Sequence, residues 1–178
     1  MSLAPPHHDP APVRAVASHR LLIATLSVSN FVIGMGAFMI IGLLEPLAEG
    51  LAISPARAGT VLTTYAVTYA ILSPILVSLT GGIGRRRVLA AGLALFGLGC
   101  ALPVLLPSEV ALHISRILAA AGAGLFTPVA AAVAAGLSAP ERRAKALAAV
   151  FFGMTMSQIL GLPIGSFVAY TFGWRAAF

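Results

Sequence analysis

Arg116 is the one fully charged side chain inside an otherwise apolar stretch of this 178-residue chain. It follows Glu109 by seven residues, which places it about 10 Å along a helix from the start of that stretch. An arginine at the centre of a membrane span costs about 2.5 to 3.5 kcal/mol, and somewhat less off centre, so its side chain should face protein or water. The position therefore indicates a coupling or gating charge.

The helical neighbours of Arg116 also favour a side chain that faces protein. The residues that share its face at i+3, i+4, i+7 and i+8 are all small: Ala119, Ala120, Ala123 and Gly124. A face of small residues lets a second helix approach closely. The alternative is that the long side chain reaches the nearer membrane surface along its own helix.

Weakly polar and aromatic faces on three other apolar stretches are candidates for a substrate cavity. Aromatic rings suit an apolar substrate, and polar groups orient it. The candidate residues are Asn30, Phe38, Tyr65, Tyr69 and Gln158. Gln158 is equally suited to a structural bond between helices, and Ser and Thr on these faces also bond to their own helix.

A stripe of small residues runs along the last apolar stretch. Gly153, Ser157, Gly161 and Gly165 follow one another in steps of four, and Pro163 interrupts the hydrogen-bond ladder between the last two. Such a stripe permits close backbone packing, and the proline permits a kink. By itself the stripe predicts tight helix packing.

Composition places these residues in a membrane protein. The chain is 59% hydrophobic and 9% charged, whereas soluble domains are roughly 25% charged. Its net charge of +6 comes without an aromatic-interleaved basic patch, so no nucleic-acid partner is expected. Cys100 is the single cysteine, which excludes an intrachain disulfide. No span places a His, Cys or Ser near a carboxylate, and no metal-ligand spacing occurs, so neither an enzyme, a metal site nor a cofactor is expected.

The predicted architecture is an all-α integral membrane bundle behind a disordered cytoplasmic tail of residues 1–20. The first apolar stretch, 21–44, has 24 uncharged residues, or about 36 Å of helix, which is enough to cross a core of roughly 30 Å. Two acids and the Ser54-Pro55 helix start then end that span over residues 45–57. The predicted spans are 21–44, 58–79, 88–106, 110–137 and 146–170.

The basic residues orient these spans. A glycine-rich turn that carries Arg85, Arg86 and Arg87 lies between the second and third spans. Short loops rich in Lys and Arg stay on the cytoplasmic side. With that turn inside, eight of the eleven bases lie inside, two outside and one within a span. The amino terminus is therefore predicted to be cytoplasmic.

The arginine turn resembles a signature of the major facilitator superfamily, which reads approximately G-x-L-A-D-R-x-G-R-R between helices two and three. Leu79, Gly84, Arg85 and Arg86 match it, whereas Gly81 stands in place of the aspartate. Two more segments strengthen the resemblance. Residues 112–124 look like the fourth-helix motif L-x-x-x-R-x-x-Q-G-x-G, with its arginine at Arg116. Residues 161–165, Gly-Leu-Pro-Ile-Gly, look like a variant of the fifth-helix antiporter motif.

Short segments elsewhere resemble one branch of that superfamily, the arabinose-efflux-permease-like drug:proton antiporters. They are Gly42-Leu43-Leu44, Ala58-Gly59, Tyr65-Ala66 and the closing Gly-Trp-Arg-Ala-Ala-Phe of residues 173–178. The resemblance implies a bacterial, multi-pass inner-membrane carrier that works by alternating access. It would export drugs or small metabolites in exchange for protons.

The resemblance also implies residue roles. It assigns proton coupling to Arg116, the inner gate to Gly84, Arg85 and Arg86, and antiport to Gly161, Pro163 and Gly165. A glutamate often found in the first span of this branch would fall at Ala37, and no Asp or Glu remains in any predicted span.

The family has twelve helices, so the five spans found here predict a truncated bundle. Either the missing half of the transporter or self-association of the chain would cover the exposed helix faces. The alternative function is a non-transporting membrane protein that packs with another polytopic chain.

Overall fold

The computed structural model of the chain describes residues 11–178, with side chains from His19 onward, and the regular structure in this range is helical. The α-helices are α1 (Ala11–Phe38), α2 (Leu44–Leu51), α3 (Pro55–Leu79), α4 (Arg85–Leu105), α5 (Glu109–Gly136) and α6 (Arg143–Phe172). The 3-10 helices are η1 (Met39–Leu43), η2 (Pro140–Arg142) and η3 (Trp174–Ala177).

Five helical stretches within the described residues are long and apolar enough to cross a membrane, as an all-α membrane bundle requires. They are His19–Leu51, Pro55–Leu79, Arg85–Leu105, Glu109–Gly136 and Pro140–Phe172. Each overlaps one of the five spans predicted from the sequence. The predicted fold class is therefore confirmed.

The amino-terminal boundary differs from the prediction. Helix α1 begins at Ala11, so residues 11–20 of the expected disordered tail are helical, and residues 1–10 lie outside the described part. Alanine and arginine favour helix. Pro12 is tolerated there because the first turn of a helix leaves its N–H groups without partners in any case.

The carboxyl-terminal end of the first span also differs from the prediction. Residues 45–57 were expected to end that span as a connection, but α2 continues the helix to Leu51. The reason is burial, since Leu47 and Ala48 of α2 pack into the core while Glu45 stays exposed. The turn comes at Ala52, whose φ of 53° is left-handed. The predicted helix start is confirmed, because Ser54 Oγ accepts the Arg57 N–H at 3.3 Å.

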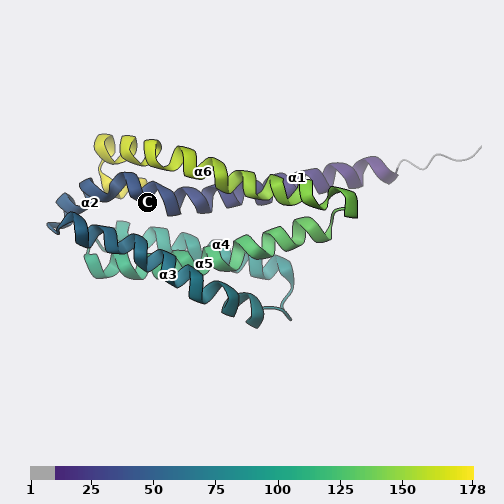
Figure 1. Ribbon diagram of the computed structural model, residues 1–178, viewed down its shortest axis with the longest axis horizontal. Helices are drawn as coiled ribbons and strands as arrows, with labels where there is room; N and C mark the ends of the chain where they lie inside the picture. The colour runs from purple at the N-terminus through teal and green to yellow at the C-terminus, as the bar shows by residue number, and fades with distance from the viewer. Residues whose placement is uncertain (1–10) are drawn as a thin grey trace, which may run out of the picture.

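Helix α5 lies at the centre of the bundle. It packs against α3 and α4 on one side and contacts α1 and α6 on the other, while α1 and α6 run side by side as a pair (Figure 1). Successive long helices alternate in direction. The α3–α4 turn and the α5–α6 connection therefore lie at one end of the bundle, and the α4–α5 turn and the C-terminus lie at the other (Figure 1).

Glycines set the closest helix approaches. A Cβ added at Gly153 of α6 would meet the backbone of Ser27 and Phe31 in α1. The predicted small-residue stripe is thus the face on which α6 packs against α1. At Gly122 of α5, an added Cβ would lie 2.6 Å from the carbonyl oxygen of Gly92 in α4. A side chain larger than hydrogen at these two positions would push the helices apart.

Candidate gating and substrate site

Arg116 projects from α5 into the interior, where none of its surface is exposed. Its Nη1 donates to the carbonyl oxygen of Gly36 in α1 at 2.9 Å, and its Nη2 donates to Ser115 Oγ at 3.2 Å. The guanidinium carbon lies 5.0 Å from the centre of the Phe178 ring, which is cation–π distance. The snorkelling alternative therefore does not describe Arg116, whose contacts are all with protein.

Two polar atoms in this interior have no hydrogen-bond partner among the described residues: Arg116 Nε and Tyr65 Oη. Tyr65 comes from α3 and stacks on Tyr69, with ring centres 6.3 Å apart and planes 20° apart. Among the residues that the structure describes, no carboxylate pairs with Arg116. The one ion pair in this part of the chain joins Arg57 and Glu109. Buried polar atoms without partners are uncommon in native proteins and mark places where water or a ligand binds.

Asn30 connects helices inside the bundle. Its Oδ1 accepts the Thr127 hydroxyl at 2.8 Å, and its Nδ2 donates to the Val150 carbonyl oxygen at 3.2 Å. Asn30 is fully buried, and these bonds join α1 to both α5 and α6. The side chain therefore holds three helices together.

The remaining predicted cavity residues lie apart. Gln158 is exposed on α6, and Phe38 is half-buried near Gly161 on the α1–α6 contact. The structure brings together Tyr65 and Tyr69, but it does not gather all five candidates around one space. Their role with substrate stays a prediction.

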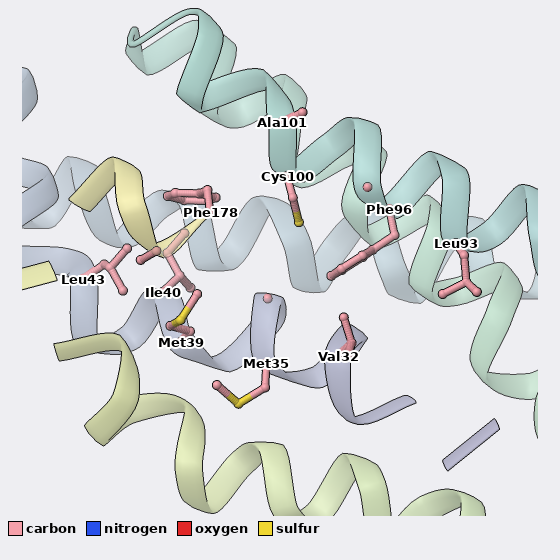
Figure 2. Close-up of a pocket in the computed structure, with 13 residues that line it drawn as sticks. Val32, Met35, Met39, Ile40, Leu43, Leu93, Phe96, Cys100, Ala101 and Phe178 are labelled. Atoms are coloured by element: carbon pink, nitrogen blue, oxygen red, sulfur yellow. The ribbon is translucent and has the colours of Figure 1, made fainter. Parts of the chain in front are cut away.

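A cavity of about 490 Å³ lies between α1, α4 and η3. Its walls are apolar. They include Met35 from α1, Met39 from η1, Phe96 and Cys100 from α4, and Phe178, which directly follows η3 (Figure 2). None of the five predicted cavity residues lines it. The signal in the sequence was the helical spacing of Val32, Met35, Gly36, Met39, Ile40 and Leu43.

The glycine-proline segment is divided between two environments. Gly161 and Gly165 are buried against Phe38, Met39 and Leu43, whereas Pro163 is exposed. The two glycines therefore belong to the contact of α6 with the end of α1 and with η1. The proline lies on the surface that α6 turns away from the described bundle.

The arginine turn is fully exposed. Gly84 caps α4 without a side-chain hydrogen bond, and Arg85, Arg86 and Arg87 form the first turn of that helix. Cations at a helix N-terminus oppose the helix dipole, so these three residues do not stabilise α4. They lie at the end of the bundle opposite the start of α5 (Figure 1).

Two side chains at the site were not singled out from the sequence. His113 of α5 bridges to α3, with Nδ1 at 2.8 Å from Thr64 Oγ1 and Nε2 at 3.4 Å from Thr60 Oγ1. Phe178 covers Arg116 from a distant part of the chain. The spacing of Thr60 and Thr64 by four residues indicated a polar face on α3 that His113 could contact. No local pattern indicated that Phe178 would lie against Arg116. No three potential metal ligands gather anywhere in the described residues.

Comparison with known proteins assigns the family. Residues 26–178 match the family profile of the Major Facilitator Superfamily. The chain belongs to that superfamily. Its members are transporters and not enzymes.

Three bacterial members of the superfamily illustrate the similarity. The chain is 33% identical over 156 residues to the uncharacterized MFS-type transporter YbcL of Bacillus subtilis (strain 168), covering 88% of this chain and 40% of YbcL. It is 33% identical to the inner membrane transport protein YdhP of Escherichia coli (strain K12), with the same coverage. It is 32% identical over 161 residues to the MFS-type transporter YfhI of Bacillus subtilis, covering 90% of this chain and 41% of YfhI. The chain thus spans about two fifths of these relatives' length.

Proposed function

We propose that this chain is the amino-terminal part of a proton-coupled carrier that exports drugs or small metabolites by alternating access. The observation that carries the proposal is Arg116, a fully buried guanidinium that bonds to the Gly36 carbonyl oxygen and lacks a carboxylate partner among the described residues. A charge is retained in a span mainly where it serves a pathway, because hydrocarbon solvates it poorly. From α5, Arg116 contacts Phe178 and the Gly36 carbonyl oxygen of α1, so a change in its contacts would alter how α5 packs against α1 and the C-terminal residue.

Several observations support a bacterial inner membrane and a cytoplasmic amino terminus. Seven described cations lie toward the end of the bundle that holds the α3–α4 turn: Arg20, Arg85, Arg86, Arg87, Arg142, Arg143 and Lys145. The opposite end has only Arg57 and Arg175, with three glutamates. By the positive-inside rule, this distribution supports a cytoplasmic location for the first group. The relative YdhP is named as an inner membrane protein.

The antiporter roles proposed for the motif residues follow the resemblance. Gly84, Arg85 and Arg86 would form part of an inner gate, since their exposed charges can pair with a second bundle that rocks against this one. Gly161, Pro163 and Gly165 would set how α6 moves against α1. Such movement needs two bundles around a central site, so the 178-residue chain alone should not perform coupled transport.

The test uses a chimera in which this chain is joined to the part of YdhP beyond its aligned segment. In inverted membrane vesicles that carry an imposed proton gradient, we expect the chimera to collapse the gradient when a compound from a drug and metabolite panel is added. Arg116→Ala should reduce that response at least tenfold while leaving the amount of inserted protein unchanged. Arg143→Ala removes an exposed cation and serves as the matched control.

Two outcomes would contradict the proposal. Full activity of Arg116→Ala would remove Arg116 from coupling. Gradient-dependent movement by the 178-residue chain in proteoliposomes would show that one partial bundle suffices. An unfolded chimera is recognised by loss of the inserted protein, and the chain alone then remains the test. The proposal is supported when the 178-residue chain inserts but transports nothing and the wild-type chimera is active. The Arg116→Ala chimera must in addition be inactive.

A further inference from the structure

A second hollow lies at the end of the bundle that carries most of the basic residues. It has a volume of about 1450 Å³ and lies between the start of α1, the α5–α6 connection and the start of α6. We call it the basic groove. Its rim includes Arg20, Arg142 and Lys145, and its walls include Leu22, Ile23 and Phe152.

The charges of the basic groove are not neutralised by the described protein. Arg20, Arg142 and Lys145 are exposed and form no ion pair with a described carboxylate. Glu141 is the nearest acid in sequence, but it does not line the groove. Three cations thus surround an opening that has room for an anion.

The polarity of the groove changes along its length as it does across a membrane surface. Arg20 directly precedes the uncharged stretch of α1, and Lys145 directly precedes that of α6. Ser27 and Phe152 are the lining residues farthest along α1 and α6, and they follow those cations by seven residues, or about 10 Å of helix. The groove therefore runs from charged groups at the interface to apolar groups in the hydrocarbon.

The polar contacts at the back of the basic groove hold its shape. His19 Nε2 lies 3.3 Å from Ser138 Oγ, which in turn donates to the Ala134 carbonyl oxygen at 2.8 Å. These contacts attach the start of α1 to the end of α5. One wall of the groove is thereby held in place where the start of α1 meets the end of α5.

From this placement we propose that the basic groove binds an anionic phospholipid, with the phosphate at Arg20, Arg142 and Lys145 and an acyl chain along Leu22, Ile23 and Phe152. Basic pockets between membrane helices bind anionic headgroups. A free phosphate would use only the rim, whereas a phospholipid uses both the rim and the apolar wall. The proposal concerns the membrane-embedded chain itself and does not depend on the transported substrate.

The test measures lipid binding to the purified chain in detergent. Phosphatidylglycerol and phosphatidylcholine with identical acyl chains are added, and bound lipid is counted by native mass spectrometry. We expect the wild type to retain phosphatidylglycerol preferentially. The triple variant Arg20→Gln/Arg142→Gln/Lys145→Gln should lose roughly a hundredfold in apparent affinity for it, since each of the three cations contributes about fivefold.

The arginine turn supplies a matched control. Arg85→Gln/Arg86→Gln/Arg87→Gln removes the same charge from the same end of the bundle, but these residues do not line the basic groove. This variant should keep the preference for phosphatidylglycerol. Equal loss in both triple variants would overturn the proposal in favour of diffuse charge attraction.

A substitution that keeps all the charges tests the apolar wall. Ala149 lines the groove and is half-buried, so Ala149→Trp should fill it and lower retention of phosphatidylglycerol at least tenfold. Unchanged retention in Ala149→Trp would overturn the assignment of the acyl chain. Inorganic phosphate should not displace the lipid at equal concentration, and displacement would identify a simple anion site. Because Ala149→Trp leaves the rim intact, the proposal can be tested even where the charge variants fold poorly.

Discussion

Helices α5 and α3 are both long and apolar enough to cross a membrane, yet the bundle treats them differently. In α5, 67% of the spanning stretch is buried inside the protein, against 6% in α3. The run from Ala119 to Gly124 in α5 consists only of Ala and Gly and is entirely buried, whereas Ile71 and Ile75 of α3 are exposed. In lipid, a large apolar side chain gains no hydrophobic free energy by moving into the bundle. Small residues, by contrast, allow the backbones of two helices to approach closely. Small side chains therefore distinguish the central helix from the peripheral one.

The same difference governs polar side chains. On α5, Arg116 and Thr127 bond to α1. On α3, Ser78 bonds to its own helix through the Pro74 carbonyl oxygen. These two polar groups of the central helix thus reach α1 across the bundle. Ser73 of α3 reaches only the adjacent α5, through the Gly124 carbonyl oxygen, and Ser78 stays within its own helix. Substitutions in the two helices should differ accordingly.

The largest effect on stability is expected at Gly122. In Gly122→Val the added methyl groups would meet Phe96 N and the Gly92 carbonyl oxygen, so α4 must move and the free energy of unfolding should fall by about 3 kcal/mol. Gly59→Val on α3 is the control, because an added Cβ there meets nothing within 4 Å. Thermal unfolding can be followed by a thiol-reactive dye on Cys100, the single cysteine. Equal midpoints for the two variants would remove the distinction between the helices.

An intermediate effect is expected at the Asn30–Thr127 contact. Asn30→Ala should lower the free energy of unfolding by about 0.6 to 1.7 kcal/mol, the range of hydrogen bonds between membrane helices. Thr127→Val should cost a similar amount, and the double variant should cost less than the sum. Ser78→Ala on α3, which removes a bond within one helix, should change stability by less than about 0.5 kcal/mol. Strict additivity of the two single variants would show that the contact carries no coupling.

The smallest effect is expected where α3 and α5 meet at their exposed ends. Arg57 donates to Glu109 through Nε at 3.0 Å and Nη2 at 2.8 Å, with 65% and 26% of the two side chains exposed. Water screens such a pair, so a double-mutant cycle with Arg57→Gln and Glu109→Gln should give a coupling of about 0.2 to 1 kcal/mol. Measured at high salt, the coupling should shrink. A coupling that is large and independent of salt would mean that this end is as tightly packed as the centre of α5.

Local patterns predicted local features well. The Ser54 cap, the exposed arginine turn and the small-residue face of α6 were each readable within one or two helical turns. The continuation of the helix to Leu51 was not, because it depends on burial of Leu47 against distant residues. Asn30 was predicted to line a cavity, but its two hydrogen-bond partners lie 97 and 120 residues away.

The sequence by itself determined the membrane class, the number and approximate limits of the apolar helices in residues 11–178 and the concentration of positive charge in two connections. These follow from hydropathy, helix length and caps, which act between neighbouring residues. Tertiary structure alone decided that Phe178 covers Arg116, that Gly36 supplies its carbonyl partner and that Arg20 joins Arg142 and Lys145 around one groove. Those contacts depend on which helix faces meet. Because lipid accommodates all apolar faces equally well, the faces that pack together are those whose side chains allow the backbones to approach most closely.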